Sequence, residues 1–243
     1  MKQTYFTITS NVALTADVYQ MTLLGDTTDI KCGQFVNIKV EGFYLRRPIS
    51  VCDVVADTLT LVYKVVGGGT EAMSKMPVGS KLDLLTQLGN GYNLDKTTNH
   101  AVLLGGGVGV PPLYLCAKKL VEAGKKVTVI LGFNTQSEIF YEKEFAALGA
   151  TVLVTTVDGS YGTKGFVTDA LKQVEDYDYF YTCGPEPMLK AVYNATNTSG
   201  EFSFEERMGC GFGACMGCSC ETKYKNLRIC KEGPVLTKEI IIW

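Results

Sequence analysis

The sequence predicts an α+β protein of several domains: an N-terminal antiparallel β-barrel, an α/β domain with a parallel sheet, and a short cysteine-rich C-terminal segment. Three observations support this prediction. Short β-type segments follow one another through residues 1–97, strands alternate with helices through 98–200, and five of the nine cysteines lie within 201–243. With 46% hydrophobic and 20% charged residues, the 243-residue chain has the composition of a globular protein.

Residues 1–97 contain short segments rich in Val, Ile, Thr and aromatic residues, separated by turn residues. The expected strands are Tyr5–Thr9, Val18–Leu24, Gln34–Val40, Pro48–Val54, Thr58–Val65 and Lys81–Thr86. One short helix is expected over Glu71–Met76. Short strands at this spacing favour a closed antiparallel barrel, because closure leaves no exposed edge.

The pattern changes near residue 98, where strands begin to alternate with helices. The expected strands are Ala101–Leu104, Lys126–Gly132, Thr151–Thr156 and Tyr179–Cys183, and the expected helices are Pro111–Ala123, Glu142–Leu148, Phe166–Val174 and Pro187–Thr196. This alternation predicts a parallel sheet covered on both faces. From about Glu201 the regular pattern ends, and a segment this short must be fixed in place by something other than its own core.

Composition excludes several classes of function. The formal net charge of -2 provides no strong basic field for nucleic acid or anionic lipid. His100 is the only histidine, which excludes a His-rich metal site and argues against a Ser–His–Asp triad. No apolar run approaches the roughly 20 residues that span a bilayer, and the first residues lack the apolar core of a signal peptide. We therefore expect a cytoplasmic protein.

The C-terminal cysteines have a characteristic spacing. Cys210 and Cys215 are separated by four residues, Cys218 follows after two more, and Cys230 after a further eleven. This is the plant-type ferredoxin spacing for a [2Fe–2S] cluster held by four thiolates. Glycines between the ligands permit tight turns and leave N–H groups free to face the sulfur atoms.

Two other interpretations of these cysteines exist. A four-cysteine zinc site usually has two C-x2–4-C pairs joined by a longer arm, which fits three ligands within nine residues poorly. A set of unrelated buried thiols would not explain the crowding. Cys220 is the extra cysteine, and we expect it to be a packed neighbour or a substitute for Cys218.

Two stretches of the barrel, one with a pair of arginines and one rich in glycine, suggest a diphosphate site. Arg46, Arg47 and Ser50 stand at the start of a strand, where a guanidinium could bind a diphosphate and a hydroxyl could complete the anion's contacts. The run Gly67–Thr70 is a glycine loop that enters a short helix, a common phosphate-binding arrangement. The alternative is a basic surface loop beside a strand.

The second domain contains a strand, a glycine loop and a helix start in that order. The loop glycines are Gly105, Gly106, Gly107 and Gly109, and Val110 stands where the last glycine of G-x-G-x-x-G would be. The order still favours dinucleotide binding, although a loop with only a packing role is the alternative. After the next strand, residues 131–136 carry no cation that could pair with a 2′-phosphate, which favours NAD over NADP.

Taken together, these motifs resemble the ferredoxin reductase-like flavoproteins, and specifically the electron-transfer subunits of class 1B, NAD-dependent dihydroorotate dehydrogenases. The resemblance covers essentially the whole chain. It is carried by the stretches Arg46–Ser50, Leu104–Pro112, Cys183–Met188 and Glu206–Cys218.

The resemblance implies three cofactor sites. FAD would be bound in domain 1–97 by Arg47, Pro48, Ile49, Ser50, Val62, Tyr63, Lys64, Gly69 and Thr70. NAD(H) would be bound in domain 98–200 by Gly105, Gly106, Gly107, Gly109, Gly184 and Pro185. The cluster in segment 201–243 would be ligated by Cys210, Cys215, Cys218 and Cys230. Cys183 would lie near the nicotinamide and flavin as a candidate catalytic residue, or else be a buried thiol at a strand end.

The resemblance also implies a partner and a reaction. The partner would be an FMN-containing catalytic subunit that oxidises dihydroorotate in pyrimidine biosynthesis, with two copies of each subunit in the assembly. Electrons would pass from the partner's FMN through the cluster and FAD to NAD+, so this chain would need no general base. The alternatives are the small subunit of an NADH-dependent ferredoxin–NADP reductase or sulfide dehydrogenase, and a non-enzymatic, zinc-stabilised interaction module.

Overall fold

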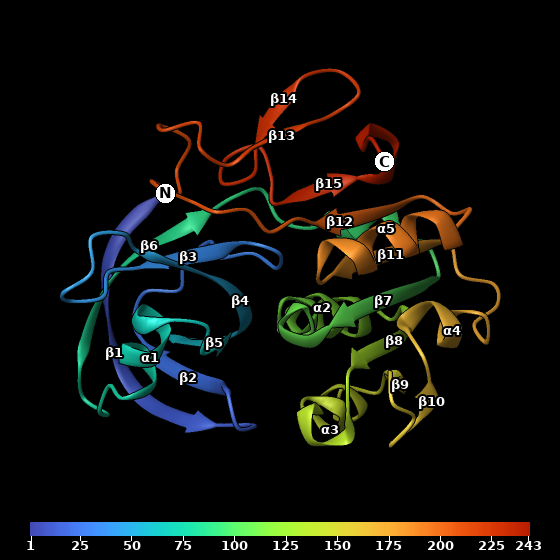
Figure 1. The fold of residues 1–243 in the computed structure, drawn as a ribbon, viewed down its shortest axis with the longest axis horizontal. Helices are drawn as coiled ribbons and strands as arrows, with labels where there is room; N and C mark the ends of the chain where they lie inside the picture. The colour runs from blue at the N-terminus through green and yellow to red at the C-terminus, as the bar shows by residue number, and fades with distance from the viewer.

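The computed structural model describes residues 1–243. Its N-terminal part is a closed antiparallel barrel with the strand order β1-β2-β5-β4-β3-β6 (Figure 1). The strands are β1 (Lys2–Ala13), β2 (Val18–Leu24), β3 (Phe35–Ile38), β4 (Arg47–Val55), β5 (Thr58–Lys64) and β6 (Lys81–Leu88), with helix α1 (Gly68–Ser74) before β6. The predicted barrel is confirmed. Strand β1 is longer than expected, and its register shifts between Ile8 and Ser10, a bulge that lets a long strand bend around the barrel.

The second part is a seven-stranded sheet with the order β10-β9-β8-β7-β11-β12-β15. Its strands are β7 (His100–Gly106), β8 (Lys126–Phe133), β9 (Thr151–Thr156), β10 (Thr163–Lys164), β11 (Tyr179–Cys183), β12 (Gly200–Ser203) and β15 (Val235–Thr237). All neighbours pair in parallel except β15, which is antiparallel to β12. Every residue of β7 is buried, as expected for a central strand covered on both faces.

Helices cover both faces of this sheet, as predicted. They are α2 (Tyr114–Glu122), α3 (Glu142–Ala147), α4 (Val167–Leu171) and α5 (Glu186–Ala195). In Figure 1, α2 and α3 lie on the side that turns toward the barrel, and α4 and α5 lie on the other side. Short 3-10 turns occur at Leu94–Lys96, Gly107–Gly109, Pro111–Leu113, Gln136–Glu138 and Lys238–Ile240.

The C-terminal segment forms a small hairpin and then rejoins the sheet. The hairpin strands are β13 (Ser219–Glu221) and β14 (Asn226–Arg228), and β15 pairs Val235 with Ser203 of β12. The expected boundary between residues 200 and 201 therefore falls within β12. The segment shares an apolar core with Phe35 of the barrel and Phe180 of the sheet, to which it contributes Leu227, Ile229, Leu236 and Ile241. This packing fixes a segment that could not fold alone.

The barrel and the sheet also pack against each other. A single apolar core contains residues of both, including Val51 of β4 and Leu115 of α2. Lys118 of α2 donates to Asp53 of β4 at 3.0 Å, and the Tyr141 hydroxyl donates to Gln20 of β2 at 2.9 Å. None of the helices has the length and apolar character needed to cross a bilayer.

Candidate functional site

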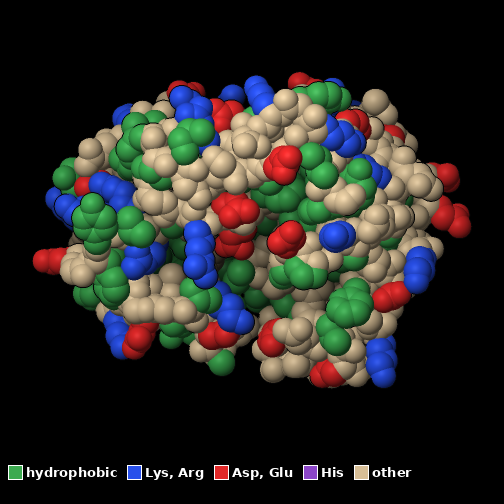
Figure 2. Space-filling view, turned by 45° about the horizontal axis from the view of Figure 1, so that its top comes forward, with side chains coloured by type: hydrophobic (Ala, Val, Ile, Leu, Met, Phe, Trp, Pro, Cys, Tyr) green, Lys and Arg blue, Asp and Glu red, His purple; other side chains and the backbone are tan.

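A cavity of about 600 Å³ lies between the barrel and the carboxyl ends of the parallel strands. The barrel contributes Ser50 and Lys64, and the loops after β7, β8, β9, β11 and β12 form the opposite wall. In Figure 2 the surface is hollowed between the barrel at the left and the sheet domain at the right, with acidic side chains above the hollow. Open α/β sheets bind ligands at this edge, because all parallel strands end there.

The cavity brings together predicted residues from both domains. Its wall contains Ser50, Lys64, Gly106, Gly107, Gly109, Cys183, Gly184 and Pro185. The other predicted cofactor residues lie outside this wall, namely Arg47, Pro48, Ile49, Val62, Tyr63, Gly69, Thr70 and Gly105. Two predicted flavin residues, Ser50 and Lys64, thus line the same cavity as the predicted nucleotide loops.

The loop after β7 lies against the loop after β11. A side chain at Gly109 would collide with the carbonyl oxygen of Cys183, and Gly107 has a φ of 52° in the left-handed region. Glycine at position 109 therefore lets the two loops approach closely, and glycine at position 107 permits the left-handed turn. The backbone of the β7 loop stays open to the cavity, as binding of a pyrophosphate requires.

Cys183 ends β11 and lines the cavity. Burial, together with the negative charge of Glu205, raises the pKa of the Cys183 thiol to about 12. A thiol with this pKa is protonated at neutral pH and is not an activated nucleophile. Cys183 therefore suits the role of a neutral neighbour of a ligand. Glu205, an exposed residue after β12, lines the same cavity and was not predicted from the sequence.

The two adjacent arginines of the barrel have different surroundings. Arg46 pairs with Asp83 at 2.9 Å and also donates to the carbonyl oxygens of Asn37 and Asp83, so its charge stabilises the barrel. Arg47 forms no ion pair, and its guanidinium lies 4.9 Å from the centre of the Phe43 ring. A side chain at Gly69 would collide with that guanidinium. Arg47 and Gly69 are therefore adjacent. The guanidinium donates to the carbonyl oxygens of Leu45 and Arg46, and no carboxylate pairs with its charge.

The remaining predicted flavin residues are held by the barrel itself. The Thr70 hydroxyl accepts hydrogen bonds from the N–H groups of Val66 at 3.0 Å and Gly67 at 3.3 Å, which closes the glycine loop. Val62 and Tyr63 are buried, and the Tyr63 hydroxyl donates to Asn11 at 3.0 Å. Pro48 and Ile49 pair with Asn37 and Val36 of β3.

The far end of the cavity has an acidic and an aromatic wall. The Glu138 carboxylate accepts hydrogen bonds from the backbone N–H of Asn134 at 3.2 Å and from its side-chain amide at 3.0 Å. Phe166 is 61% exposed and lines the same cavity. Lys64, on the barrel side, is the only Lys or Arg in the cavity wall. This arrangement offers a carboxylate to a ribose hydroxyl and no cation to a 2′-phosphate.

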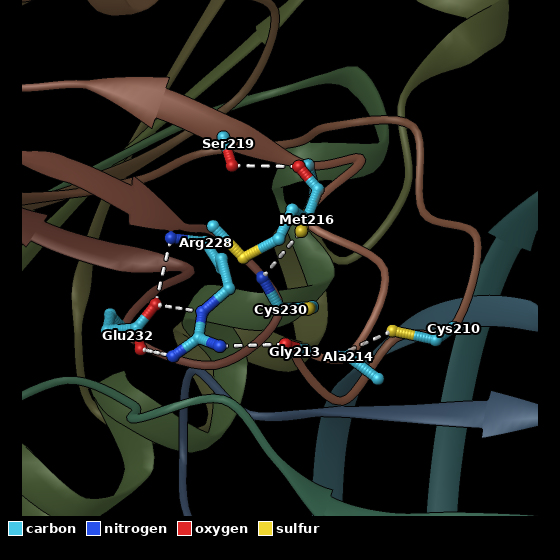
Figure 3. Close-up of polar contacts among 9 residues, drawn as sticks. Cys210, Gly213, Ala214, Met216, Ser219, Arg228, Cys230 and Glu232 are labelled. Atoms are coloured by element: carbon cyan, nitrogen blue, oxygen red, sulfur yellow. Dashed lines mark hydrogen bonds and ion pairs between the residues drawn. The ribbon is translucent and has the colours of Figure 1, made fainter.

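The predicted ligands lie in two pairs, each joined by a bond from a backbone N–H to a sulfur atom. Three of the four belong to residues 210–218, here called the cysteine loop, and Cys230 lies on the arm that follows β14; Figure 3 shows Cys210 and Cys230. The Cys215 sulfur accepts from the N–H of Cys210 at 3.4 Å, and the Cys218 sulfur accepts from the N–H of Cys230 at 3.4 Å. Burial favours the neutral thiol of Cys210, but N–H groups such as those of Phe212 and Cys215 outweigh it and lower its pKa to about 6. Burial and the neighbouring Cys218 raise the pKa of Cys230 to about 12.

The paired arrangement fits a two-iron cluster. Each iron of a [2Fe–2S] cluster takes two of the four protein ligands, so the ligands are needed in pairs. A single zinc ion needs ligands that converge on one point, and a spacing that crowds three ligands into nine residues fits that need poorly. Cys220 belongs to neither pair. It is half-buried on β13 and packs against the apolar core of the C-terminal segment.

Arg228 connects the cysteine loop to the arm that carries Cys230. The Arg228 guanidinium donates to the carbonyl oxygen of Gly213 at 2.7 Å, within the loop between Cys210 and Cys215 (Figure 3). The same side chain donates to Glu232 at 2.9 Å, just after Cys230. Sequence reasoning missed this clamp. Its only local signal is the i,i+4 spacing of an arginine and a glutamate.

Comparisons with known proteins agree with this geometry. A family model described as the iron-sulfur cluster binding domain of dihydroorotate dehydrogenase B matches residues 205–242, and one described as an oxidoreductase NAD-binding domain matches residues 103–194. The dihydroorotate dehydrogenase B (NAD(+)) electron transfer subunit of Fusobacterium nucleatum is 44% identical, over 94% of this chain and 94% of that protein. The corresponding subunit of a Geobacillus species is 45% identical, over 97% and 96%.

Solved structures share the fold. An NADH-dependent reduced ferredoxin-NADP oxidoreductase superposes with a TM-score of 0.90 at 30% identity, covering 98% of this chain and 90% of that one. A flavohemoglobin from Malassezia yamatoensis has a TM-score of 0.69 at 19% identity, covering 80% of this chain and 56% of that one, which shows the fold alone. By its full-length relatives, this chain belongs to the family of electron transfer subunits of dihydroorotate dehydrogenase B (NAD(+)), and its fold is ferredoxin reductase-like.

Proposed function

We propose that this chain relays electrons from dihydroorotate oxidation on a partner FMN subunit to NAD+, with FAD and a [2Fe–2S] cluster as its own cofactors. The observation that carries the proposal is the cavity that joins Ser50 of the flavin strand to the loops after β7 and β11. The cysteine loop contacts the same barrel, because Asn37 of β3 donates to the carbonyl oxygen of Cys210 at 3.2 Å. One barrel thus contacts both the nucleotide loops and the cysteine loop.

The chain's residues bind and orient the cofactors. Arg47 supplies an unpaired charge for the FAD diphosphate, with Gly69 leaving room beside it and Ser50 facing the cavity. Cys210, Cys215, Cys218 and Cys230 supply the thiolates. When bound, the cluster supplies single-electron transfer, and FAD links it to the two-electron hydride chemistry of NAD(H). The protonated thiol of Cys183 leaves the cavity without an activated nucleophile beside the nicotinamide, so we assign it a positioning role.

The names of the relatives support the partner. They are named as electron transfer subunits of dihydroorotate dehydrogenase B (NAD(+)), so we infer an FMN-containing catalytic subunit as the partner and a heterotetramer with two copies of each chain. This assignment places the chain in pyrimidine biosynthesis. We infer a cytoplasmic location, because thiols that ligate iron persist in a reducing compartment.

Reconstitution with the catalytic subunit tests the proposal. Both chains would be co-expressed and purified without air, and NADH formation would be followed at 340 nm after addition of dihydroorotate and NAD+. We expect a stable complex that forms NADH, and a Cys215→Ser variant of this chain that keeps its FAD but forms little NADH. A complex that oxidises dihydroorotate equally well with the variant would contradict the relay.

A second candidate is the small subunit of an NADH-dependent ferredoxin–NADP reductase. It is supported by the TM-score of 0.90 with such an enzyme. Identification of the subunit that co-purifies from the native cell distinguishes the two candidates. A zinc-stabilised interaction module would instead give a colourless protein that contains zinc and no iron.

A further inference from the structure

Asn37 lies where the flavin strand meets the cysteine loop. It belongs to β3, and its register partner is Pro48 of β4, inside the predicted FAD stretch. Its side chain is turned to the cysteine loop, and its amide nitrogen donates to the carbonyl oxygen of Cys210 at 3.2 Å. Asn37 is 1% exposed. One buried side chain therefore links a predicted cluster ligand to the neighbour of the predicted flavin strand.

Both sides of this contact are held in place. A side chain at Gly211 would collide with the Asn37 amide nitrogen, and Gly211 has a φ of 77° in the left-handed region. The loop can therefore reach Asn37 only with glycine at this position. On the barrel side, Arg46 donates to the backbone carbonyl of Asn37 at 3.2 Å and is itself paired with Asp83. The backbone that carries the Asn37 amide and the loop that carries its acceptor, the Cys210 carbonyl oxygen, are therefore both held in place.

Burial of the Asn37 amide lowers the stability of the fold, which suggests that the hydrogen bond from its nitrogen has a function. Its Oδ1 atom is buried and has no hydrogen-bond partner. A buried acceptor without a partner destabilises the fold, and an apolar side chain of similar volume would avoid this cost. Packing alone therefore does not account for an asparagine here. The bond from Nδ2 to Cys210 is the interaction that an apolar residue could not make.

We propose that Asn37 is a positioning residue that holds the Cys210 end of the cysteine loop against the flavin strand and so sets the rate of electron exchange between the cluster and FAD. This inference rests on the proposed function, because it assumes both cofactors. Each exchange moves one electron, two exchanges match the two electrons of one NADH, and Asn37 is neither oxidised nor reduced. Asn37 acts only through distance and rigidity.

The test compares two rates in Asn37→Leu, which removes the amide at similar volume. The protein, purified without air with both cofactors, is mixed rapidly with NADH. Stopped-flow absorbance gives the rate of flavin bleaching, and freeze-quench EPR gives the rate at which the reduced cluster appears. We expect unchanged bleaching and iron content but several-fold slower cluster reduction. Gly211→Ala disturbs the same contact from the loop side and should slow the same step.

Gln34→Leu is the matched control. Gln34 is also a buried amide next to β3, but it donates to the carbonyl oxygen of Gly89 at 3.0 Å, outside the cysteine loop. We expect both rates to be unchanged in this variant. The inference is overturned if Asn37→Leu reduces its cluster at the wild-type rate, or if it loses iron, since Asn37 would then help to hold the cluster. Failure of the wild type to show a flavin or a cluster phase would instead contradict the proposed function.

Discussion

Glu138 lies in the 3-10 turn that follows β8, where two hydrogen bonds from Asn134 hold it in place, and it lines the cavity without a cationic partner. Its carboxylate would accept a hydrogen bond from the 2′-hydroxyl of an adenosine ribose and repel a 2′-phosphate. We expect Glu138→Gln to weaken NADH binding and to increase the rate of flavin reduction by NADPH about tenfold, equivalent to about 1.4 kcal/mol. Stopped-flow bleaching with each nucleotide measures this preference, and an unchanged ratio of the two rates would contradict it.

Glu201 is a buried carboxyl that makes stability depend on pH. Burial raises the pKa of Glu201 to about 7 from an ordinary value of 4.5, although the backbone N–H of Asn93 donates to it. Because the folded pKa is raised, the contribution of this group is fully present below about pH 4.5 and is lost as the pH rises through 7. The total loss is about 3 kcal/mol.

Glu201→Gln imitates the protonated carboxyl and removes this dependence. We expect the variant to gain stability over the wild type as the pH rises from about 5 to 8, by up to about 3 kcal/mol. Urea unfolding at several pH values measures the difference. Parallel stability curves for the two proteins would show that Glu201 does not titrate in this range.

Neighbouring residues show what sequence alone could not decide. Arg46 and Arg47 are equivalent in sequence, and only the fold brings Asp83 to one of them, leaving the other unpaired. The cysteine spacing, in contrast, is local, so the four predicted ligands could be chosen from sequence. Glu205 was missed because its position in the cavity depends on β12, a strand with no alternating pattern in its four residues.

At the scale of elements, the strands of the barrel and the central strands of the sheet were predictable, including the short β3 and β11, whereas the strands that attach the C-terminal segment were not. Strands β2, β8 and β9 match the expected segments closely, since their patterns span six to eight residues. Strands β12 and β15 have four and three residues, and their pairing joins segments more than thirty residues apart. Such pairing depends on the packed core rather than on local propensity. The fold class followed from sequence, whereas the attachment of the C-terminal segment did not.

The hairpin strand β14 positions the cysteine loop through Arg228. Its bonds to Gly213 and Glu232 hold the loop that carries Cys210 and Cys215 against the arm that carries Cys230. We expect Arg228→Met to lower the iron content well below the roughly two atoms per chain of a [2Fe–2S] cluster. Arg228→Lys should give an intermediate value, because it keeps the charge without the planar fork. Iron analysis of protein purified without air measures this.

Lys225→Met provides the control for charge. Lys225 lies in the turn between β13 and β14, and its side chain makes no hydrogen bond or ion pair. This variant should keep its iron, and all three variants should keep FAD and NADH-dependent flavin bleaching. Equal iron in Arg228→Met and the wild type would show that the clamp does not hold the loop.

The molecule as a whole depends on the contact between its two large domains. The Lys118–Asp53 pair lies in that contact, with side chains 21% and 15% exposed. We expect Lys118→Met to destabilise the protein by about 2 kcal/mol, because it leaves the Asp53 carboxylate largely buried without its partner. The Lys118→Met, Asp53→Asn double variant should recover part of this loss. Denaturant unfolding, followed by tyrosine fluorescence and circular dichroism, measures both.

The shared apolar core predicts how the domains unfold. One core contains residues of both the barrel and the sheet. Tyrosine fluorescence and circular dichroism should therefore change together in a single unfolding transition. Two separate transitions would show that the domains fold independently. The cavity would then depend on the ligand rather than on the protein to hold its two walls together.

The most direct test of the account is an anaerobic titration of the purified protein with NADH, followed by visible absorption and EPR. The account predicts flavin absorbance over an iron–sulfur background, about two iron atoms per FAD, bleaching of the flavin by NADH and appearance of a reduced [2Fe–2S] signal. A colourless protein from fresh, iron-replete cells, or a flavin that NADH does not bleach, would contradict it.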